Sequence, residues 1–278
     1  MKKWTKTIVL GLVALLGLTA CGNNSQEAEK ETQTVKLGVI GDDTRDWDSV
    51  RDRLENEGIK LEYVKFSDYN QPNQALAQGE IDLNAFQHQV FLDKFNEQFG
   101  TDLVSIGNTV VAPLAIYSDK IDKLEDLPDG AKVAIPNDVT NGGRAIILLE
   151  SAGLIEVDDA AGITPTPKDI TKNDKNLQIE EMDASQTARA LGDVDIALVN
   201  SGFAVDAGLD PKTDALFTEP VDERSKPYVN IVAARKEDED NPVYAKVVDA
   251  YQTDETKRII DEKSKGANQP AWEQFGKK

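Results

Sequence analysis

Hydrophobic and polar residues alternate along the chain with two different periods. Hydrophobic residues occupy every second position in residues 35–39 and again in 59–63, which is typical of strands with one buried face. Between these segments, residues 47–54 place hydrophobic side chains three and four positions apart, which predicts a helix. Gly58 is a residue type that commonly ends a helix, so we expect the helix to stop there.

The same exchange between strand and helix periods continues along the chain, so we predict an α/β fold with mostly parallel sheets. Pro72 favours the start of a short helix that Gly79 ends. Two long extended hydrophobic stretches, 103–117 and 228–234, bracket the middle third of the chain and are typical of two crossings between two lobes. Further strands are expected at 131–135, 177–180 and 194–199, and further helices at 90–98, 143–152, 185–191, 242–251 and 255–264.

The first residues have the pattern of an export signal. Lysines precede an apolar run at 8–17, which is shorter than the roughly 20 residues of a permanent membrane helix. The run ends in Leu18-Thr19-Ala20-Cys21, which resembles the lipobox of bacterial lipoproteins. By that resemblance, residues 1–20 are cleaved and Cys21 carries acyl chains that anchor the protein to the cell membrane, while residues 21–33 form a flexible tether. The alternative is an ordinary secretory signal with an incidental cysteine.

Composition narrows the range of partners. Cys21 is the only cysteine, so neither an internal disulfide nor a cysteine metal cluster is possible. The formal net charge of -19 repels nucleic acid and anionic lipid surfaces, so we expect no nucleic-acid partner and no membrane contact besides the lipid anchor. A chain of 278 residues is long enough for two domains.

Most enzymatic sites are incompatible with the sequence. His88 is the only histidine, so an HExxH zinc site is impossible, and the chain has no Walker loop and no GxSxG motif. A Ser-His-Asp triad would have to use His88; because a triad is recognised by geometry, a lipid-anchored hydrolase stays an alternative. The acidic residues Asp42, Asp43, Asp46 and Asp48 do not have the spacing of a calcium loop, and we interpret them as a solvated helix start. We therefore expect no catalytic residue, no metal and no cofactor.

A candidate anion site lies at residues 136–144, Pro-Asn-Asp-Val-Thr-Asn-Gly-Gly-Arg, which follow a predicted strand and open a helix. Glycines allow close approach of the backbone, and the free N–H groups of a helix start favour an anion. Arg144 adds a planar fork of donors suited to a carboxylate. The alternative is a capped helix start with a surface arginine.

Two further loops have a similar character. Residues 66–73 and 84–88 place aromatic and amide side chains between a strand and a helix, and Asn200 ends another predicted strand. In α/β sheets, ligands bind at loops of this kind. The alternative for each loop is a turn with one core aromatic residue.

The chain resembles the methionine-binding lipoproteins of ABC importers, the NlpA/MetQ family of substrate-binding proteins. The resemblance covers essentially the whole mature chain. It is carried by short motifs in the family's order and spacing: Asp68-Tyr69, Gln71-Pro72-Asn73-Gln74-Ala75-Leu76, Gly79-Glu80-Ile81-Asp82, Phe86-Gln87-His88, Val111-Ala112-Pro113, residues 132–138, Thr140-Asn141, Gly143-Arg144 and Pro227-Tyr228-Val229-Asn230-Ile231.

The resemblance implies a two-lobed periplasmic-binding-protein fold of type II, with two α/β lobes joined by two hinge strands. Lobe 1 would hold residues 34–112 and 230–278, and lobe 2 residues 113–229, with the ligand between them. A ligand that touches both lobes shifts the population towards the closed form.

The resemblance also implies a role for individual residues. Arg144 would pair with the ligand carboxylate, assisted by Asn141 at the helix start. Aromatic residues would wall the side-chain pocket, where a thioether packs well against ring faces, and two asparagines would fix the ammonium and backbone polar groups. The wall residues are Tyr69, Phe86 and His88, and the asparagines are Asn200 and Asn230.

One region departs from the family pattern. Many members have an aromatic residue immediately before Phe-Gln-His and a Pro-Tyr pair after it, whereas this chain has Ala85 and Val90-Phe91. If the missing ring faces the ligand, the pocket is roomier and could take a methionine-containing dipeptide or another apolar amino acid. If it faces the core, the change has no effect on the ligand.

These observations predict a non-enzymatic, monomeric, lipid-anchored solute-binding protein outside the cytoplasm. Its ligand would be L-methionine or a close relative, and its partners the permease and ATPase of an ABC importer. We expect Arg144→Ala to remove most binding without unfolding the chain. The other alternative is a surface lipoprotein for adhesion or signalling, which would not need Arg144.

Overall fold

The computed structural model describes residues 32–278. The predicted signal peptide, Cys21 and nearly all of the predicted tether lie outside the described residues. Along residues 32–278, no helix combines the length and the apolar character needed to cross a membrane.

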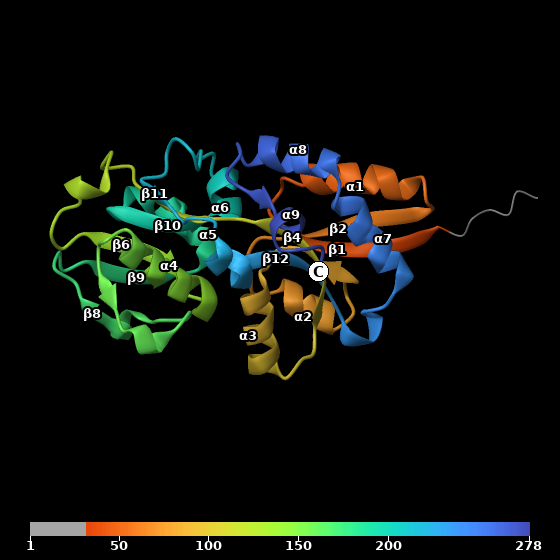
Figure 1. Cartoon of the computed structure of the whole chain (residues 1–278), viewed down its shortest axis with the longest axis horizontal. Coiled ribbons are helices and arrows are strands. Elements are labelled where there is room, and N and C mark those ends of the chain that lie inside the picture. The colour runs from red at the N-terminus through yellow and green to blue at the C-terminus, as the bar shows by residue number, and fades with distance from the viewer. Residues whose placement is uncertain (1–31) are drawn as a thin grey trace, which may run out of the picture. The chain divides into compact units, whose positions relative to one another are not determined.

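The described chain builds two main sheets, each with its own helices, in a two-lobed α/β arrangement (Figure 1). We call the part around the six-stranded sheet lobe 1 and the part around the five-stranded sheet lobe 2. The strand order of the first sheet is β13-β4-β12-β3-β1-β2. Its strands are β1 (Gln33–Ile40), β2 (Ile59–Phe66), β3 (Leu83–Asn84), β4 (Val104–Val111), β12 (Val229–Ala234) and β13 (Gln269–Pro270).

The second sheet has the order β11-β5-β10-β6-β9. Its strands are β5 (Leu114–Tyr117), β6 (Lys132–Pro136), β9 (Gln178–Met182), β10 (Ile196–Asn200) and β11 (Phe217–Thr218), and a separate short pair consists of β7 (Glu156–Val157) and β8 (Ile170–Lys172). In this lobe, buried side chains from β5, β6, β10 and the next helix, α4 (Val139–Ser151), form one hydrophobic core.

Strand directions correct the expectation of mostly parallel sheets. β1 is parallel to β2 and β3, and β6 is parallel to β9 and β10. The other pairings, including β12 with β4 and β5 with β10, are antiparallel. For β4 and β12 the reason is the crossing between lobes. β4 leads the chain out of the first sheet and β12 brings it back, so the two neighbouring strands run in opposite directions and pair antiparallel.

Helices of lobe 1 pack on both faces of its sheet (Figure 1). One core cluster joins α1, α7 and α8 to the sheet, with Trp47, Leu54, Val247 and Ile260 among its buried residues. The bounds of these helices are α1 (Arg45–Glu55), α2 (Pro72–Ala77), α3 (Gln89–Phe99), α7 (Pro242–Tyr251), α8 (Asp254–Lys263) and α9 (Ala271–Gln274).

Most predicted elements are confirmed, with two differences at helices. The helix expected at 143–152 begins at Val139, because Asp138 caps it by accepting hydrogen bonds from two backbone N–H groups. The helix expected at 185–191 is divided into α5 (Ala184–Thr187) and a 3-10 turn. A further short helix, α6 (Ser201–Asp206), follows β10.

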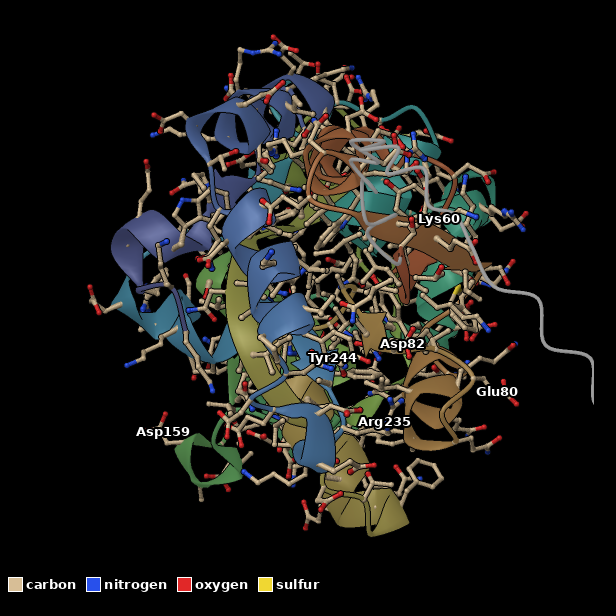
Figure 2. The ribbon with its side chains drawn as sticks, turned by 90° about the vertical axis from the view of Figure 1, so that its right-hand side faces the viewer. Lys60, Glu80, Asp82, Asp159, Arg235 and Tyr244 are labelled. Atoms are coloured by element: carbon tan, nitrogen blue, oxygen red, sulfur yellow. The ribbon has the colours of Figure 1, made fainter. Side chains whose placement is uncertain are left out.

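Arg235, which follows directly after β12, binds the segment between α2 and β3 in lobe 1. Its Nη1 donates to the carbonyl oxygens of Leu76 (3.2 Å) and Ile81 (2.8 Å), and its Nη2 lies 2.6 Å from a carboxylate oxygen of Asp238. Figure 2 shows Arg235, Asp82 and Tyr244 near one another, and Arg235 Nη2 lies 4.0 Å from a carboxylate oxygen of Asp82. These contacts hold the connection between α2 and β3, which leads directly into one of the predicted binding loops.

Candidate functional site

One cavity lies between the two lobes, with lining residues from both. Its empty volume is about 1190 Å³, including space open to solvent. Every binding residue that the sequence predicts lines this cavity, although the residues come from five separate segments: Tyr69, Phe86, His88, Asn141, Arg144, Asn200 and Asn230.

The start of α4 forms one wall of the cavity. Asp138 accepts hydrogen bonds from the backbone N–H groups of Thr140 (3.2 Å) and Asn141 (2.9 Å) and from the Asn141 side chain (3.0 Å). Gly143 lies so close to Thr164 that a Cβ atom there would be 2.6 Å from the Thr164 Cα. The cap and the glycine therefore place Asn141 and Arg144 on the cavity side of the helix. Because Arg144 is buried, the alternative of a surface arginine is wrong.

Arg144 is held on several sides by groups that sequence reasoning missed. Its Nε donates to the Glu219 carboxylate at 2.9 and 3.0 Å, and its Nη2 also pairs with Glu219. Nη2 donates in addition to the carbonyl oxygen of Ala112 at 3.0 Å, and the guanidinium lies over the Tyr228 ring, 4.6 Å from its centroid. The ion pair leaves this region close to neutral, and Nη1 has no hydrogen-bond partner within residues 32–278.

Asn141 and Asn200 connect the two neighbouring strand ends of lobe 2. Asn200 Nδ2 donates to Asn141 Oδ1 at 2.8 Å. Asn200 Oδ1 is buried and has no hydrogen-bond partner within the described part of the chain. A buried carbonyl oxygen that lines a cavity is suited to accept a hydrogen bond from an ammonium group or an amide.

His88 is a neutral hydrogen-bond donor in this cavity. Its Nδ1 accepts the backbone N–H of Phe91 at 3.1 Å, so the ring proton is on Nε2. Burial, with a contribution from the positive charge of Arg144, lowers the pKa of His88 to about 3. Nε2 is buried without a hydrogen-bond partner among residues 32–278. No carboxylate in that range hydrogen-bonds to the ring, so the geometry of a Ser-His-Asp triad is not present around His88.

Aromatic side chains from both lobes form another wall. The ring of Tyr69 lies 5.7 Å from that of Phe86, 6.1 Å from that of Phe91 and 4.9 Å from that of Phe203, between centroids. Burial raises the pKa of Tyr69 well above its usual range, so its hydroxyl stays protonated. Phe203, in α6 of lobe 2, was not predicted as part of this wall, because its contact with Tyr69 depends on how the two lobes meet.

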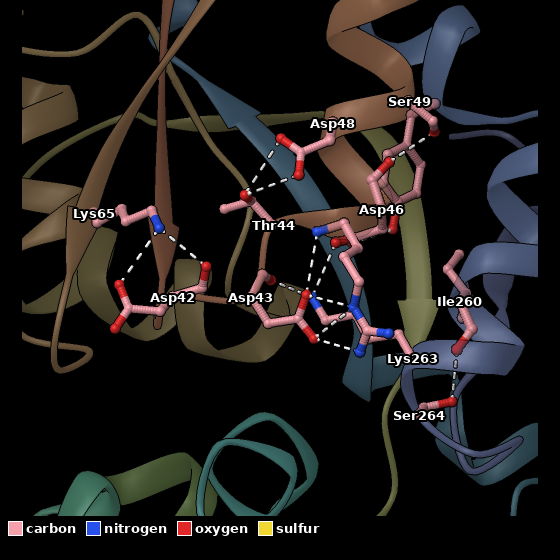
Figure 3. Close-up of polar contacts among 12 residues, drawn as sticks. Asp42, Asp43, Thr44, Asp46, Asp48, Ser49, Lys65, Ile260, Lys263 and Ser264 are labelled. Atoms are coloured by element: carbon pink, nitrogen blue, oxygen red, sulfur yellow. Dashed lines mark hydrogen bonds and ion pairs between the residues drawn. The ribbon is translucent and has the colours of Figure 1, made fainter.

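At its other end, the cavity reaches the acidic start of α1. Figure 3 shows Lys263 donating to the backbone oxygen of Asp43 and to the carboxylate of Asp46, at 2.5 and 2.9 Å. Asp42 pairs with Lys65. The interpretation of this cluster as a solvated helix start holds for the exposed Asp42 and Asp48 and is corrected for Asp46, which is largely covered and bound to a lysine. Within the described residues, no group of three His, Cys, Asp or Glu side chains could hold a metal ion.

The cavity therefore combines a buried arginine paired with Glu219, polar atoms that have no partner within residues 32–278, and a wall of aromatic rings. A small zwitterion with a hydrophobic side chain fits this combination, because a carboxylate can meet the arginine, an ammonium can meet an unpaired oxygen, and an apolar side chain can pack on the rings. Side-chain selection would come from the aromatic wall.

Comparisons with known proteins point in one direction. The family model described as NlpA lipoprotein matches residues 35–272. The D-methionine-binding lipoprotein MetQ of Salmonella typhimurium is 40% identical over 272 residues, covering 96% of this chain and 98% of that protein. The MetQ of Escherichia coli is 39% identical, with the same coverage.

Solved structures agree with the sequence comparisons. The substrate-binding protein of a methionine transporter from Streptococcus pneumoniae has a TM-score of 0.82 at 44% identity, covering 86% of this chain and 96% of that one. A nutrient-binding protein from Burkholderia cenocepacia, solved bound to methionine, has a TM-score of 0.81 at 41% identity, covering 85% of this chain and 99% of that one.

Proposed function

This chain belongs to the NlpA lipoprotein family, and from that premise we propose that it captures methionine between its two lobes and delivers it to an ABC importer. The observation that carries the proposal is the cavity in which Arg144, His88 and an aromatic wall meet. The proposed activity is binding and release, in which no covalent bond of the ligand changes.

In the proposed complex, Arg144 donates from Nη1 to the ligand carboxylate, with Asn141 beside it. The partnerless Asn200 Oδ1 and Asn230 accept from the ammonium, and the thioether lies against Tyr69 and Phe86 in addition to His88. A charge-assisted hydrogen bond contributes about 1.5–3 kcal/mol, and burial of a methionine-sized side chain contributes roughly the same. Support comes from the position of all these residues on one cavity.

We further propose lobe limits of 34–112 with 230–278 for lobe 1, and 113–229 for lobe 2. The support is that strands β1 to β4 and β12 to β13 belong to the first sheet, and β5, β6 and β9 to β11 to the second. The proposed monomer would be anchored outside the cytoplasm through acyl chains on Cys21, and its partners would be the permease and ATPase of the importer. The names of the relatives, which are lipoproteins, support this placement.

One observation favours a second candidate ligand. Ala85 lines the cavity and also packs against the core of lobe 1, so its small side chain leaves room next to Phe86. From there the cavity continues to Trp47 and the carboxylates at the start of α1. A methionine-containing dipeptide could use that space, with its amino group towards the carboxylates.

Native mass spectrometry of the chain from Gly22 onward tests both candidates. The protein is measured as purified and after partial unfolding and refolding, with L-methionine, D-methionine, methionine sulfoxide or Gly-Met added back. We expect selective recovery of the methionine mass. Selective recovery of Gly-Met would change the ligand and keep the transport role. No bound small molecule under any condition would contradict the proposal.

The matched control is Ala85→Tyr, which narrows the cavity without touching Arg144. If the dipeptide is the ligand, this variant loses Gly-Met and keeps methionine. If methionine is the ligand, the variant binds it with an affinity close to that of the natural chain.

A further inference from the structure

Three buried amide side chains in lobe 1, Asn73, Asn84 and Gln87, form a hydrogen-bonded cluster. Asn73 Nδ2 donates to Gln87 Oε1 at 2.7 Å. Gln87 Nε2 donates to Asn73 Oδ1 at 2.6 Å and to Asn84 Oδ1 at 2.9 Å. Asn84 Nδ2 completes the cluster by donating to Asn73 Oδ1 at 2.9 Å.

Each amide in this cluster has a donor and an acceptor in use. Asn73 and Asn84 are 0% exposed and Gln87 is 3% exposed, so water cannot replace a lost partner without opening the core. An amide presents its donor and acceptor on opposite sides, so every donor of the cluster meets an acceptor, and the hydrogen bond from Asn84 Nδ2 to the carbonyl oxygen of Pro72 (3.5 Å) fixes which way the amides are turned. Hydrophobic residues of the same shape would fill this space at little cost in stability, which indicates that the polar groups serve to define a geometry.

The amides join the segments that carry one side of the binding site. Asn73 lies in the first turn of α2, directly after the loop that holds Tyr69, and Gln87 lies between Phe86 and His88. The backbone continues the connection, because Gln87 O accepts the N–H of Ile231 at 2.9 Å and His88 pairs with Asn230 in an isolated bridge.

We propose that Asn73, Asn84 and Gln87 are positioning residues, which hold the loops of Tyr69 and of Phe86–His88 in the arrangement that binds the ligand. The proposal rests on the proposed function, because the loops matter only if the cavity is the ligand site. None of the three residues needs to touch the ligand for this role, although Gln87 borders the cavity.

Gln87→Glu keeps the shape of the side chain, but it replaces the amide nitrogen with an oxygen and adds a negative charge when the carboxyl is ionised. The new oxygen faces Asn73 Oδ1 and Asn84 Oδ1, so two hydrogen bonds become contacts between acceptors. We expect the Kd for methionine, measured by isothermal titration calorimetry, to rise at least about tenfold, as it does when supporting hydrogen bonds of directly binding residues are removed in metal sites.

A second variant separates positioning from stability. Asn73→Leu, Asn84→Leu and Gln87→Met together remove every polar group of the cluster and keep its shape. We expect the Tm to return close to the natural value while the Kd stays raised. Recovery of both together would overturn the proposal, because the amides would then act on stability alone.

Asn96 supplies the matched control in the same lobe. Its side chain donates to Leu103 O at 2.8 Å and accepts from Leu103 N and from Thr101, yet it does not line the cavity. Asn96→Leu should lower the Tm and leave the Kd unchanged. An equal rise in Kd for Asn96→Leu and Gln87→Glu would also overturn the proposal.

A measurement on the ligand-free protein tests the positioning role independently of methionine binding. The ¹⁵N shifts of the His88 ring and of the Phe91 amide report the hydrogen bond between them in the ligand-free protein. We expect both shifts to change in Gln87→Glu and not in Asn96→Leu. If the natural chain binds no methionine, the proposed function fails on its own, and unchanged shifts in Gln87→Glu would then overturn the positioning role.

Discussion

Arg144 is the residue on which the proposed binding site depends most directly. Its guanidinium is buried between Glu219, the Ala112 carbonyl and the Tyr228 ring, which fix its orientation before any ligand arrives. A fixed donor loses little conformational entropy when the ligand binds, so more of the interaction appears as affinity. The same burial makes Arg144 part of the fold as well as of the site.

Arg144→Ala should raise the Kd for methionine by about 10- to 100-fold, because a charge-assisted hydrogen bond worth about 1.5–3 kcal/mol is lost. From the sequence we expected this variant to keep its fold. The structure predicts a loss of stability instead, because Glu219 would remain largely covered without its partner. Removing one member of such a pair costs up to about 3–5 kcal/mol of stability.

The double variant Arg144→Met with Glu219→Gln distinguishes the two effects. It should recover much of the free energy of unfolding, measured in urea, while the Kd measured by calorimetry stays high. Unchanged affinity in either variant would show that the ligand carboxylate binds elsewhere.

His88 makes a second prediction at the residue scale. Its pKa is about 3 in the folded chain, against about 6.5 when unfolded. As the pH falls below about 6.5, the unfolded chain takes up a proton that the folded chain does not, so stability is lost on acidification towards pH 3.

Between pH 7 and pH 5, the natural chain should therefore lose about 2 kcal/mol more stability than His88→Asn, at about 1.4 kcal/mol per pKa unit. Asparagine keeps an acceptor for the Phe91 N–H, because it is a good N-cap residue. Urea unfolding of both proteins at the two pH values measures the difference, and parallel pH profiles would contradict the lowered pKa.

At the scale of one element, the position of α4 depends on close backbone contact at its first turn. A Cβ atom at Gly143 would lie 2.6 Å from Thr164 Cα and 3.0 Å from Thr164 C, so backbone rather than a flexible side chain must move. Arg144 is the next residue, so any shift of this turn moves its guanidinium relative to Glu219.

We expect Gly143→Ala to destabilise the protein by about 1–3 kcal/mol through overpacking and to weaken methionine binding. Gly192→Ala is the matched control, because nothing lies within 4 Å of its added Cβ and its φ is not positive. The control should change the stability by less than about 0.5 kcal/mol. Calorimetric Tm and Kd values for the two variants make the comparison, and equal effects would remove the steric explanation.

At the scale of the whole molecule, the site depends on contact between the lobes. Ser201 at the start of α6 donates to Asn268 in lobe 1 at 2.7 Å, Asn70 donates to Asp183 at 3.1 Å, and the Tyr69 ring packs on Phe203. These contacts favour the arrangement in which the cavity is enclosed from both sides, and a ligand that touches both lobes adds to them.

Ser201→Ala should shift the lobes towards an open arrangement and raise the Kd about 2- to 10-fold, since a hydrogen bond contributes about 0.5–1.5 kcal/mol. Small-angle X-ray scattering without ligand should show a larger radius of gyration. Ser151→Ala is the control, because that hydroxyl donates only within α4, to Ile147 O. A similar response in both variants would argue against a role for the contact between lobes.

The sequence by itself determined most of the elements and named residues that the structure brings to one cavity. Hydrophobic patterns with a period of two or of 3.6 residues show whether a strand or a helix has one buried face. Because this property depends only on neighbouring residues in the sequence, β1, α1, β2 and α7 appear where they were predicted. Tyr69 and His88 were found because each lies in a loop between a strand and a helix, and Arg144 because it lies near the start of a helix; all three stand within a family motif.

Only the tertiary structure decided which distant residues complete the site. Glu219 is 75 positions from Arg144 along the chain, and nothing in its neighbourhood marks it as an ion-pair partner. The contact of Phe203 with Tyr69 and the hydrogen bonds among the three amides are equally invisible in sequence, although the sequence analysis named the loops that carry the amides, because such contacts depend on distance in space. The antiparallel pairing of β4 with β12 likewise follows from the return of the chain to lobe 1, which periodicity does not encode.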